Sequence, residues 1–260
     1  MRTVIVCLAL MLASWGAAMF GFATLVAATC VVEGMLRIGI LNRYIVPLPS
    51  EVMLSFPRIV IEEKILERFL TTFMECLYAM LLVSVIGILT GILLYRFTAL
   101  RAATETWVAA AASAPIVLAY PLFLVVFGRS MTTIVMIGFI AGLPPVILKT
   151  LEGLAGTRRV LVDVGRSLKL GPWQMFAKIL LPAALPTVFV GLRLGLIFCL
   201  INIVGVEFLI NYGGLGQVIN DRAERYDLAG TYAAIGFVIL TSVLFFVVTE
   251  RIERWLRPQT

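Results

Sequence analysis

The chain has 260 residues, of which 61% are hydrophobic and only 14% are charged, and its formal net charge is +6. Soluble domains average about 45–50% apolar and about 25% charged residues, so this composition argues against a soluble protein. The sequence contains no histidine, and its four cysteines have no paired spacing. This excludes histidine-based metal sites, catalytic triads and proton relays, and we expect no metal site and no disulfide framework.

Long apolar blocks follow one another along the chain. They carry few or no charges and cover roughly residues 3–32, 69–95, 107–127, 131–148, 186–210 and 229–249. A membrane-spanning helix needs about 20 apolar residues. The first block exceeds the about 7–15 residues of a signal-peptide core, so we expect it to be a retained span. No repeat or Gly/Ser linker divides the sequence, so we expect an all-α membrane protein with about six transmembrane helices in a single domain, 1–260.

The charges between the blocks predict the orientation of the chain. If the N-terminus is cytoplasmic, that side carries 12 basic and five acidic residues, whereas the other side carries eight of each. Cytoplasmic loops are rich in Lys and Arg, so we expect both termini and the loop 149–185 inside, and the segment 33–68 outside. The same distribution argues against a nucleic-acid partner. Ile61, Ile65 and Phe69 recur every four residues, which fits either a helix on the membrane surface or a plain connector.

Prolines interrupt two of the apolar blocks. Pro115 and Pro121 lie in the third block, and Pro144 and Pro145 lie near the inner end of the fourth. Each removes a backbone donor, which membrane helices tolerate where neighbours or water satisfy the freed groups. We expect kinked spans here. Kinks at Pro115 and Pro121 would either line a translocation pathway or only shape the packing.

Polar residues within the spans are the next candidates for function. A central charge costs about 2.5–3.5 kcal/mol on insertion scales, so it normally faces the protein interior or water. We assign Arg193 either a structural contact, with lipid phosphates or helix carbonyls, or a contact with substrate. Glu207 fits gating or loop anchoring, and Asn202 fits a bond between helices or a cavity wall. Glu75 fits the outer interface.

A glycine-rich loop, "NYGGLGQ", follows Glu207. Gly213 and Gly214 can adopt positive φ and so end a helix and turn the chain. Gly216 belongs to the same loop. The loop is therefore either an exposed helix end or an outer gate or docking loop.

The stretch "DVGRSLKLGPWQMFAKILLPAALP", Asp163 to Pro186, is charged and only half apolar. Val164 and Leu168 lie four apart on one helical face, Gly171 can end this short helix, and Pro172 fits the first turn of the next. We expect two short helices at an angle on the cytoplasmic side. A plain connecting loop needs no such shape, whereas a docking surface for a soluble partner does.

This stretch resembles the EAA loop of permeases from binding-protein-dependent ABC importers. Asp163, Val164 and Gly165 stand at the E-A-A positions, and "ILLP" at 179–182 matches the I-x-L-P ending. Lys169 stands where the family has a glycine, and Gly171 follows two residues later. "GLRLGLIFCLINIVGVEFL" followed by "GGLG" further resembles the nitrate/sulfonate/taurine branch, although Glu75 replaces an Arg that this branch often has.

The resemblance implies a type I ABC importer permease fold in a bacterial cytoplasmic (inner) membrane. It implies a coupling helix that docks on an ATPase and uses Asp163, Val164, Gly165, Leu168, Lys169 and Gly171. The implied partners are a second permease subunit (a homodimer), two cytoplasmic ATPase subunits, an extracytoplasmic substrate-binding protein and membrane lipid. No P-loop motif occurs in the sequence, so ATP and Mg²⁺ would belong to the ATPase and this chain would bind no cofactor. The implied substrate is a small anionic or organic solute.

Two other classes of membrane protein compete with this interpretation. An ion-coupled secondary transporter could use Glu75 and Glu207 as proton or cation sites, but it would more often show repeats or unwound spans. It would also leave the cytoplasmic stretch unexplained. A membrane enzyme would need a catalytic cluster, and the sequence offers no catalytic residues in a recognisable pattern.

Overall fold

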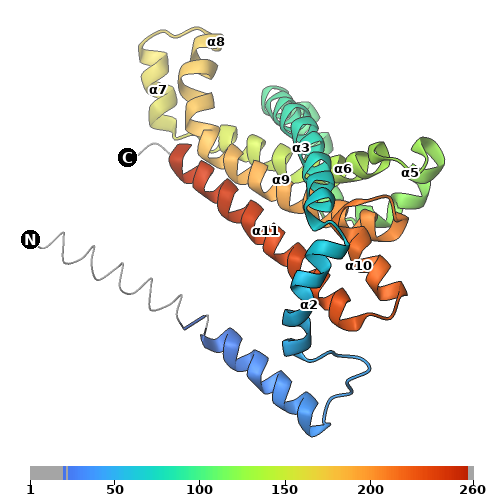
Figure 1. Ribbon diagram of the computed structural model, residues 1–260. Coiled ribbons are helices and arrows are strands. Elements are labelled where there is room, and N and C mark those ends of the chain that lie inside the picture. The colour runs from blue at the N-terminus through green and yellow to red at the C-terminus, as the bar shows by residue number, and fades with distance from the viewer. Residues whose placement is uncertain (1–19, 22, 257–260) are drawn as a thin grey trace, which may run out of the picture.

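The computed structural model describes residues 20–21 and 23–256, and within them all regular structure is helical (Figure 1). A helix over residues 23–38 comes first. The elements that follow are α2 (Pro49–Glu62), α3 (Ile65–Arg96), α4 (Thr98–Ala112), η1 (Ile116–Ala119), α5 (Tyr120–Phe127), α6 (Met131–Ala155), α7 (Arg159–Ser167), α8 (Pro172–Met175), η2 (Phe176–Leu180), α9 (Leu181–Ile210), α10 (Gly214–Glu224) and α11 (Leu228–Leu256). The all-α prediction is confirmed for the described residues.

Four helices in the described ranges are long and apolar enough to span a membrane. They are Ile65–Arg96, Met131–Ala155, the continuous run Pro172–Ile210, and Leu228–Arg251. A bent pair, α4 with η1–α5, makes a fifth candidate. The expected first span, 3–32, lies largely outside the described residues, so the count of six is not tested there.

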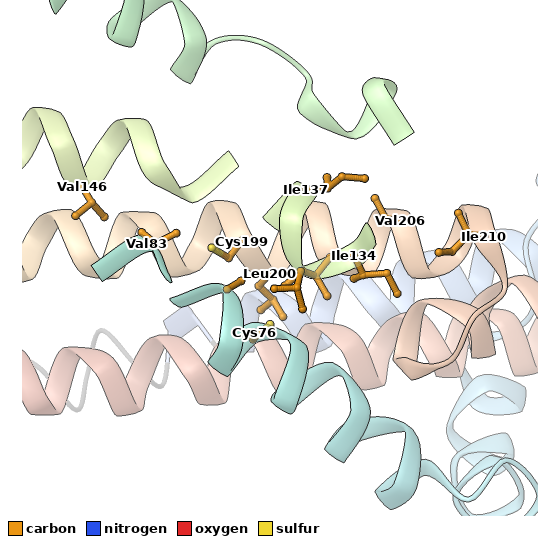
Figure 2. Packing of buried hydrophobic residues seen from close by; sticks show 12 residues of the cluster. Cys76, Val83, Ile134, Ile137, Val146, Cys199, Leu200, Val206 and Ile210 are labelled. Atoms are coloured by element: carbon orange, nitrogen blue, oxygen red, sulfur yellow. The ribbon is translucent and has the colours of Figure 1, made fainter. Parts of the chain in front are cut away.

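The core of the bundle is the contact of α6 with α9 and α3. Val83, Ile137 and Cys199 are buried in it, one from each helix (Figure 2). Gly142 and Gly195 let α6 and α9 approach closely, because a Cβ on Gly142 would lie 2.8 Å from the Gly195 carbonyl oxygen. Small residues commonly allow such contacts between membrane helices.

The third apolar block is broken near Pro115, which is a sharper change of direction than the kink expected there. The helices before and after the break are bent by 89°. α4 ends before Ser113, and Pro115 has no N–H with which to continue the ladder. Pro121 lies in the first turn of α5, where a proline is tolerated.

The other prolines do not end their helices. Pro144 and Pro145 are buried inside α6, which continues through both of them. Pro182 does not begin a separate span either, because α8, η2 and α9 are continuous. In the π-turn η2, the Leu181 N–H bonds to the Phe176 carbonyl five residues back. Such widened turns commonly accommodate a local irregularity like a proline.

The two ends of the bundle carry different structures. α7 and α8 project at one end, whereas α2 and α10 lie at the other (Figure 1). One alternative for the segment was a continuous amphipathic helix through Ile61, Ile65 and Phe69, and it is wrong. The helix is interrupted between α2 and α3 at Lys64, which has a φ of 47°. α2 packs against α11, so the segment is more than a plain connector.

Candidate functional site

The projecting helix α7 packs against α8 and η2, at the start of the continuous helical run Pro172–Ile210. Gly165 is buried at this contact, and a Cβ built on it would lie 2.5 Å from Ile179 Cδ1 and 2.7 Å from Met175 Cε. The glycine therefore serves packing within the chain. The resemblance placed Gly165 among the residues that dock on an ATPase, whereas its close contacts are with its own chain. η2 continues into α9, so this contact joins α7 to one of the helices that are long enough to span a membrane.

The opposite face of α7 carries an apolar ridge formed by Val160, Val164 and Leu168. These side chains are four residues apart and are 71%, 51% and 67% exposed. The sequence analysis found Val164 and Leu168 but missed Val160, which the same four-residue spacing would have added. Leu161, on the same helix, is also exposed. A cluster of exposed apolar side chains outside the spans is typical of a protein–protein contact.

Asp163 lies in the middle of α7, exposed, with its carboxylate 3.3 Å from the Arg166 guanidinium. Asp163 does not cap this helix, because Arg158 occupies the N-cap position. An exposed pair of this kind contributes little to stability. Asp163 therefore stays available to a partner.

Lys169 ends α7 in the position that usually takes glycine. Its φ is 52°, the Leu170 N–H donates to the Gly165 carbonyl at 3.1 Å, and the Lys169 N–H donates to the Arg166 carbonyl at 2.9 Å. These are the two bonds of a Schellman motif. The prediction that Gly171 ends this helix is wrong. Gly171 is extended and caps α8, where its N–H donates to Gln174 Oε1 at 3.2 Å.

We expect Lys169→Gly to stabilise the chain by about 1 kcal/mol, because a non-glycine residue is strained in the left-handed region. Lys169→Ala is the matched control, since it removes the charge and keeps the strain. Thermal unfolding of the purified protein in detergent should show a higher midpoint for the glycine variant only. A higher midpoint for both variants would point to the lysine charge instead of the backbone.

A second polar cluster lies at the other end, where Glu207 holds the glycine-rich loop. The Glu207 carboxylate accepts hydrogen bonds from Thr72 Oγ1 at 2.6 Å and from the Gly216 N–H at 2.8 Å. Thr72 Oγ1 in turn accepts from the Leu215 N–H at 2.9 Å. Glu207 is fully buried. The geometry fits loop anchoring, while gating stays a prediction.

The glycines of this loop are required by the same contact. Gly213 and Gly214 both have positive φ, 147° and 74°, as the sequence predicted. A side chain on Gly214 would overlap the Glu207 carboxylate. These glycines do not end α9, however. The helix ends at Ile210, and Asn211 forms its C-cap in the left-handed region.

Glu75 is fully buried on α3, and its assignment to the outer interface stays a prediction. The structure does not bring together the other residues that we expected to line the translocation pathway. The Arg193 guanidinium lies 5.4 Å from the centre of the Phe246 ring on α11. Asn202 donates to the Phe198 carbonyl of its own helix at 2.9 Å. Pro115 and Pro121 flank the bend described above.

An ion-pair hub around Arg222 joins α10 to its neighbours. The guanidinium lies 2.9 Å from Glu62, 2.6 Å from Glu63 and 3.1 Å from Asp227. Burial disfavours the charged guanidinium, yet these carboxylates raise the pKa of Arg222 above its ordinary value. Asp227 also accepts from the Gly230 N–H at 3.0 Å in the first turn of α11. The sequence analysis counted these residues only as outer charges, because nothing in a single sequence pairs them.

Comparison with known proteins agrees with this geometry. The family described as binding-protein-dependent transport system inner membrane component matches residues 84–259. The aliphatic sulfonates transport permease SsuC of Bacillus subtilis is 23% identical over 90% of this chain and 82% of its own. The formylaminopyrimidine permease ThiX of Halalkalibacterium halodurans is 24% identical over 81% and 85%. ProW of Escherichia coli, a glycine betaine/proline betaine permease, is 31% identical over 65% and 48%.

A solved structure supports the fold. A chain of the MetNI methionine ABC transporter in an inward-facing conformation superimposes with a TM-score of 0.63 and 20% identity. The match covers 72% of this chain and 94% of that one. The predicted type I ABC importer permease fold is therefore confirmed. Because the matched family spans most of the sequence, the chain belongs to the inner membrane components, or permeases, of binding-protein-dependent ABC transport systems.

Proposed function

We propose that this chain is the translocating subunit of an ATP-driven importer and that α7 is its coupling helix. The apolar ridge of α7 is the observation that carries the proposal. One face of α7 exposes this ridge, and Gly165 on another face packs against the helical run Pro172–Ile210, which contains α9. An ATPase bound to the ridge would move α7 as a rigid body, and η2 would carry the motion into α9. Rigid-body motion of this kind is a common form of switching.

The partners we propose are those that the resemblance to the permease family implies. Two cytoplasmic ATPase subunits would bind ATP and Mg²⁺, since this chain has no P-loop. A second copy of this chain would complete the pathway, and a substrate-binding protein would deliver solute to the outer end, near α10. The excess of basic residues supports a cytoplasmic location for α7 and for both termini, in a bacterial inner membrane.

The substrate we propose is a small anionic or organic solute of the sulfonate, taurine or nitrate type. The support is the "GLRLG" element, Glu207 and the following "GGLG", together with the coverage of SsuC. Relatives named for riboflavin, formylaminopyrimidine and betaine transport are similarly distant. A ligand screen on the cognate binding protein would test the substrate class separately from the transport mechanism.

Reconstitution into proteoliposomes tests the function itself. We expect the isolated chain to hydrolyse no ATP, and uptake to require the ATPase, ATP and the loaded binding protein. Uptake should persist when ionophores collapse the ion gradients. ATP hydrolysis by the isolated chain, or uptake driven by an ion gradient without ATP, would contradict the proposal and favour an enzyme or a secondary transporter.

A further inference from the structure

An apolar groove lies where the end of α3 meets α8 and η2. Its volume of about 670 Å³ is in the range of ordinary ligand pockets. The end of α3 contributes Ile92, Tyr95 and Arg96 to its wall, and the start of the Pro172–Ile210 run contributes Trp173, Met175 and Phe176, among other apolar residues. Among the described residues that line the groove, Arg96 is the only charged one. The groove therefore combines an apolar wall with a single cation.

The guanidinium of Arg96 is not used within the chain. Arg96 is the last residue of α3 and is exposed. Within the described ranges its guanidinium makes no hydrogen bond or ion pair, whereas the neighbouring Arg101 pairs with Glu105 at 2.7 Å. An arginine carries five N–H donors. Arg96 is therefore available to an anionic ligand.

The groove lies at the level of the lipid headgroups. α3 is one of the helices that are long and apolar enough to span a membrane, and its 32 residues extend about 48 Å. A bilayer with its headgroups is about 40–45 Å thick, so Arg96 at the end of α3 lies close to one membrane surface. Tyr95 and Trp173 in the groove wall agree with this position, because Tyr and Trp are enriched at membrane–water interfaces.

We propose that this groove binds an anionic phospholipid, with the lipid phosphate on Arg96 and part of an acyl chain against the apolar wall. Arginine binds phosphate through two parallel N–H bonds, and basic pockets beside membrane helices are typical sites for anionic headgroups. A soluble anion would leave the apolar wall uncovered, and an apolar protein segment would leave Arg96 without a counter-charge. A lipid anion satisfies both. Its binding requires neither the ATPase nor a transported solute.

A lipid in this groove would also support the position of α7. Met175 belongs to the groove wall, and its Cε lies 2.7 Å from the place of a Cβ built on Gly165 of α7. Val162 of α7 packs in the same apolar cluster as Ile92 and Tyr95. The lipid would therefore contact the side chains against which α7 rests, and its binding should raise the unfolding midpoint of the protein.

Thermal unfolding of the purified full chain in a neutral detergent tests the headgroup. Phosphatidylglycerol should raise the midpoint at a lower concentration than phosphatidylcholine with the same acyl chains. Arg96→Gln should need about tenfold more phosphatidylglycerol for the same rise, because it loses charge-assisted bonds to the phosphate. Arg101→Gln is the matched control, since Arg101 lies nearby but does not line the groove, and it should respond as the wild type does. Equal responses of the two variants would overturn the proposal.

Glycerol phosphate distinguishes a lipid from a free anion. It carries the phosphate of the headgroup without acyl chains, and we expect no rise in the unfolding midpoint at concentrations at which phosphatidylglycerol acts. A rise equal to that given by phosphatidylglycerol would show that the groove is a simple anion site and would overturn the proposal.

Photo-crosslinking from position 173 tests what fills the groove in the native membrane. Trp173 is 75% exposed, so a photoreactive amino acid in its place should leave the fold intact. We expect a phospholipid adduct on the peptide that contains this position, and a smaller yield of it when Arg96→Gln is added. An adduct with a second copy of this chain or with an ATPase would show that protein covers the groove, and would overturn the proposal. Either failure would leave the proposed transport function standing, because none of these measurements depends on uptake.

Discussion

Replacing Leu168 by aspartate is expected to abolish uptake and to weaken ATPase association by more than about 100-fold. Leu168 is the most terminal of the three ridge residues and is 67% exposed. A buried, unpaired carboxylate in an apolar contact costs several kcal/mol, and anchor residues at interface centres contribute about 2 kcal/mol or more. The fold should survive, because surface changes usually cost within about 0.5 kcal/mol. Val164→Asp should behave in the same way.

Gln174→Asp is the matched control. Gln174 is exposed on the same cytoplasmic projection, and an aspartate at this first-turn position can still accept from the Gly171 N–H. The measurement is co-purification of the ATPase with tagged permease, beside uptake at equal expression. Equal ATPase recovery in Leu168→Asp and Gln174→Asp would show that the ridge is not the docking surface.

Arg222→Ala should destabilise the chain by about 3–5 kcal/mol. It leaves Glu63, whose side chain is mostly shielded from water, without its close cation, and a buried ion pair that loses one partner leaves an uncompensated charge. Asp227 keeps a second cation, because Arg58 lies 2.6 Å from it. The connection between α2, α10 and the start of α11 would be lost with it. We expect a lower unfolding midpoint and reduced yield of the membrane-inserted protein.

Arg225→Ala provides the comparison for this prediction. Arg225 lies next to the hub, but its side chain is 65% exposed and its nearest contact to Glu63 is 3.9 Å. Its loss should cost no more than about 0.5 kcal/mol. Arg222→Lys should fall between the two, because lysine keeps the charge but cannot reproduce the forked bonds. Equal midpoints for Arg222→Ala and Arg225→Ala would mean that the hub contributes nothing to stability.

The class of fold and a short helix at the position of α7 could be predicted from the sequence. Hydropathy identifies spans because the bilayer imposes a length on them, and the spacing of Val164 and Leu168 indicates the exposed face of α7. The role of Gly165 could not be predicted in this way. Whether a glycine faces a partner or its own chain depends on the tertiary contact with Ile179 and Met175.

The polar clusters show more clearly what a single sequence cannot predict. Thr72 and Glu207 are 135 residues apart, and no local pattern relates them. The same holds for Arg222 and Glu62, which belong to separate elements. The helix breaks were also missed, because apolar composition alone does not tell a kink from the 89° bend near Pro115. Pairings of this kind follow from packing.

The most direct test of the central claim is photo-crosslinking from position 168 in intact cells. With a photoreactive amino acid in place of Leu168, we predict an adduct with a P-loop ATPase, identified by mass spectrometry of the crosslinked peptide. The same amino acid at Ile45, an exposed position in the outer segment, should give no such adduct. An adduct with an extracytoplasmic protein at position 168, or an ATPase adduct at position 45, would contradict both the orientation and the assignment of α7 as the coupling helix.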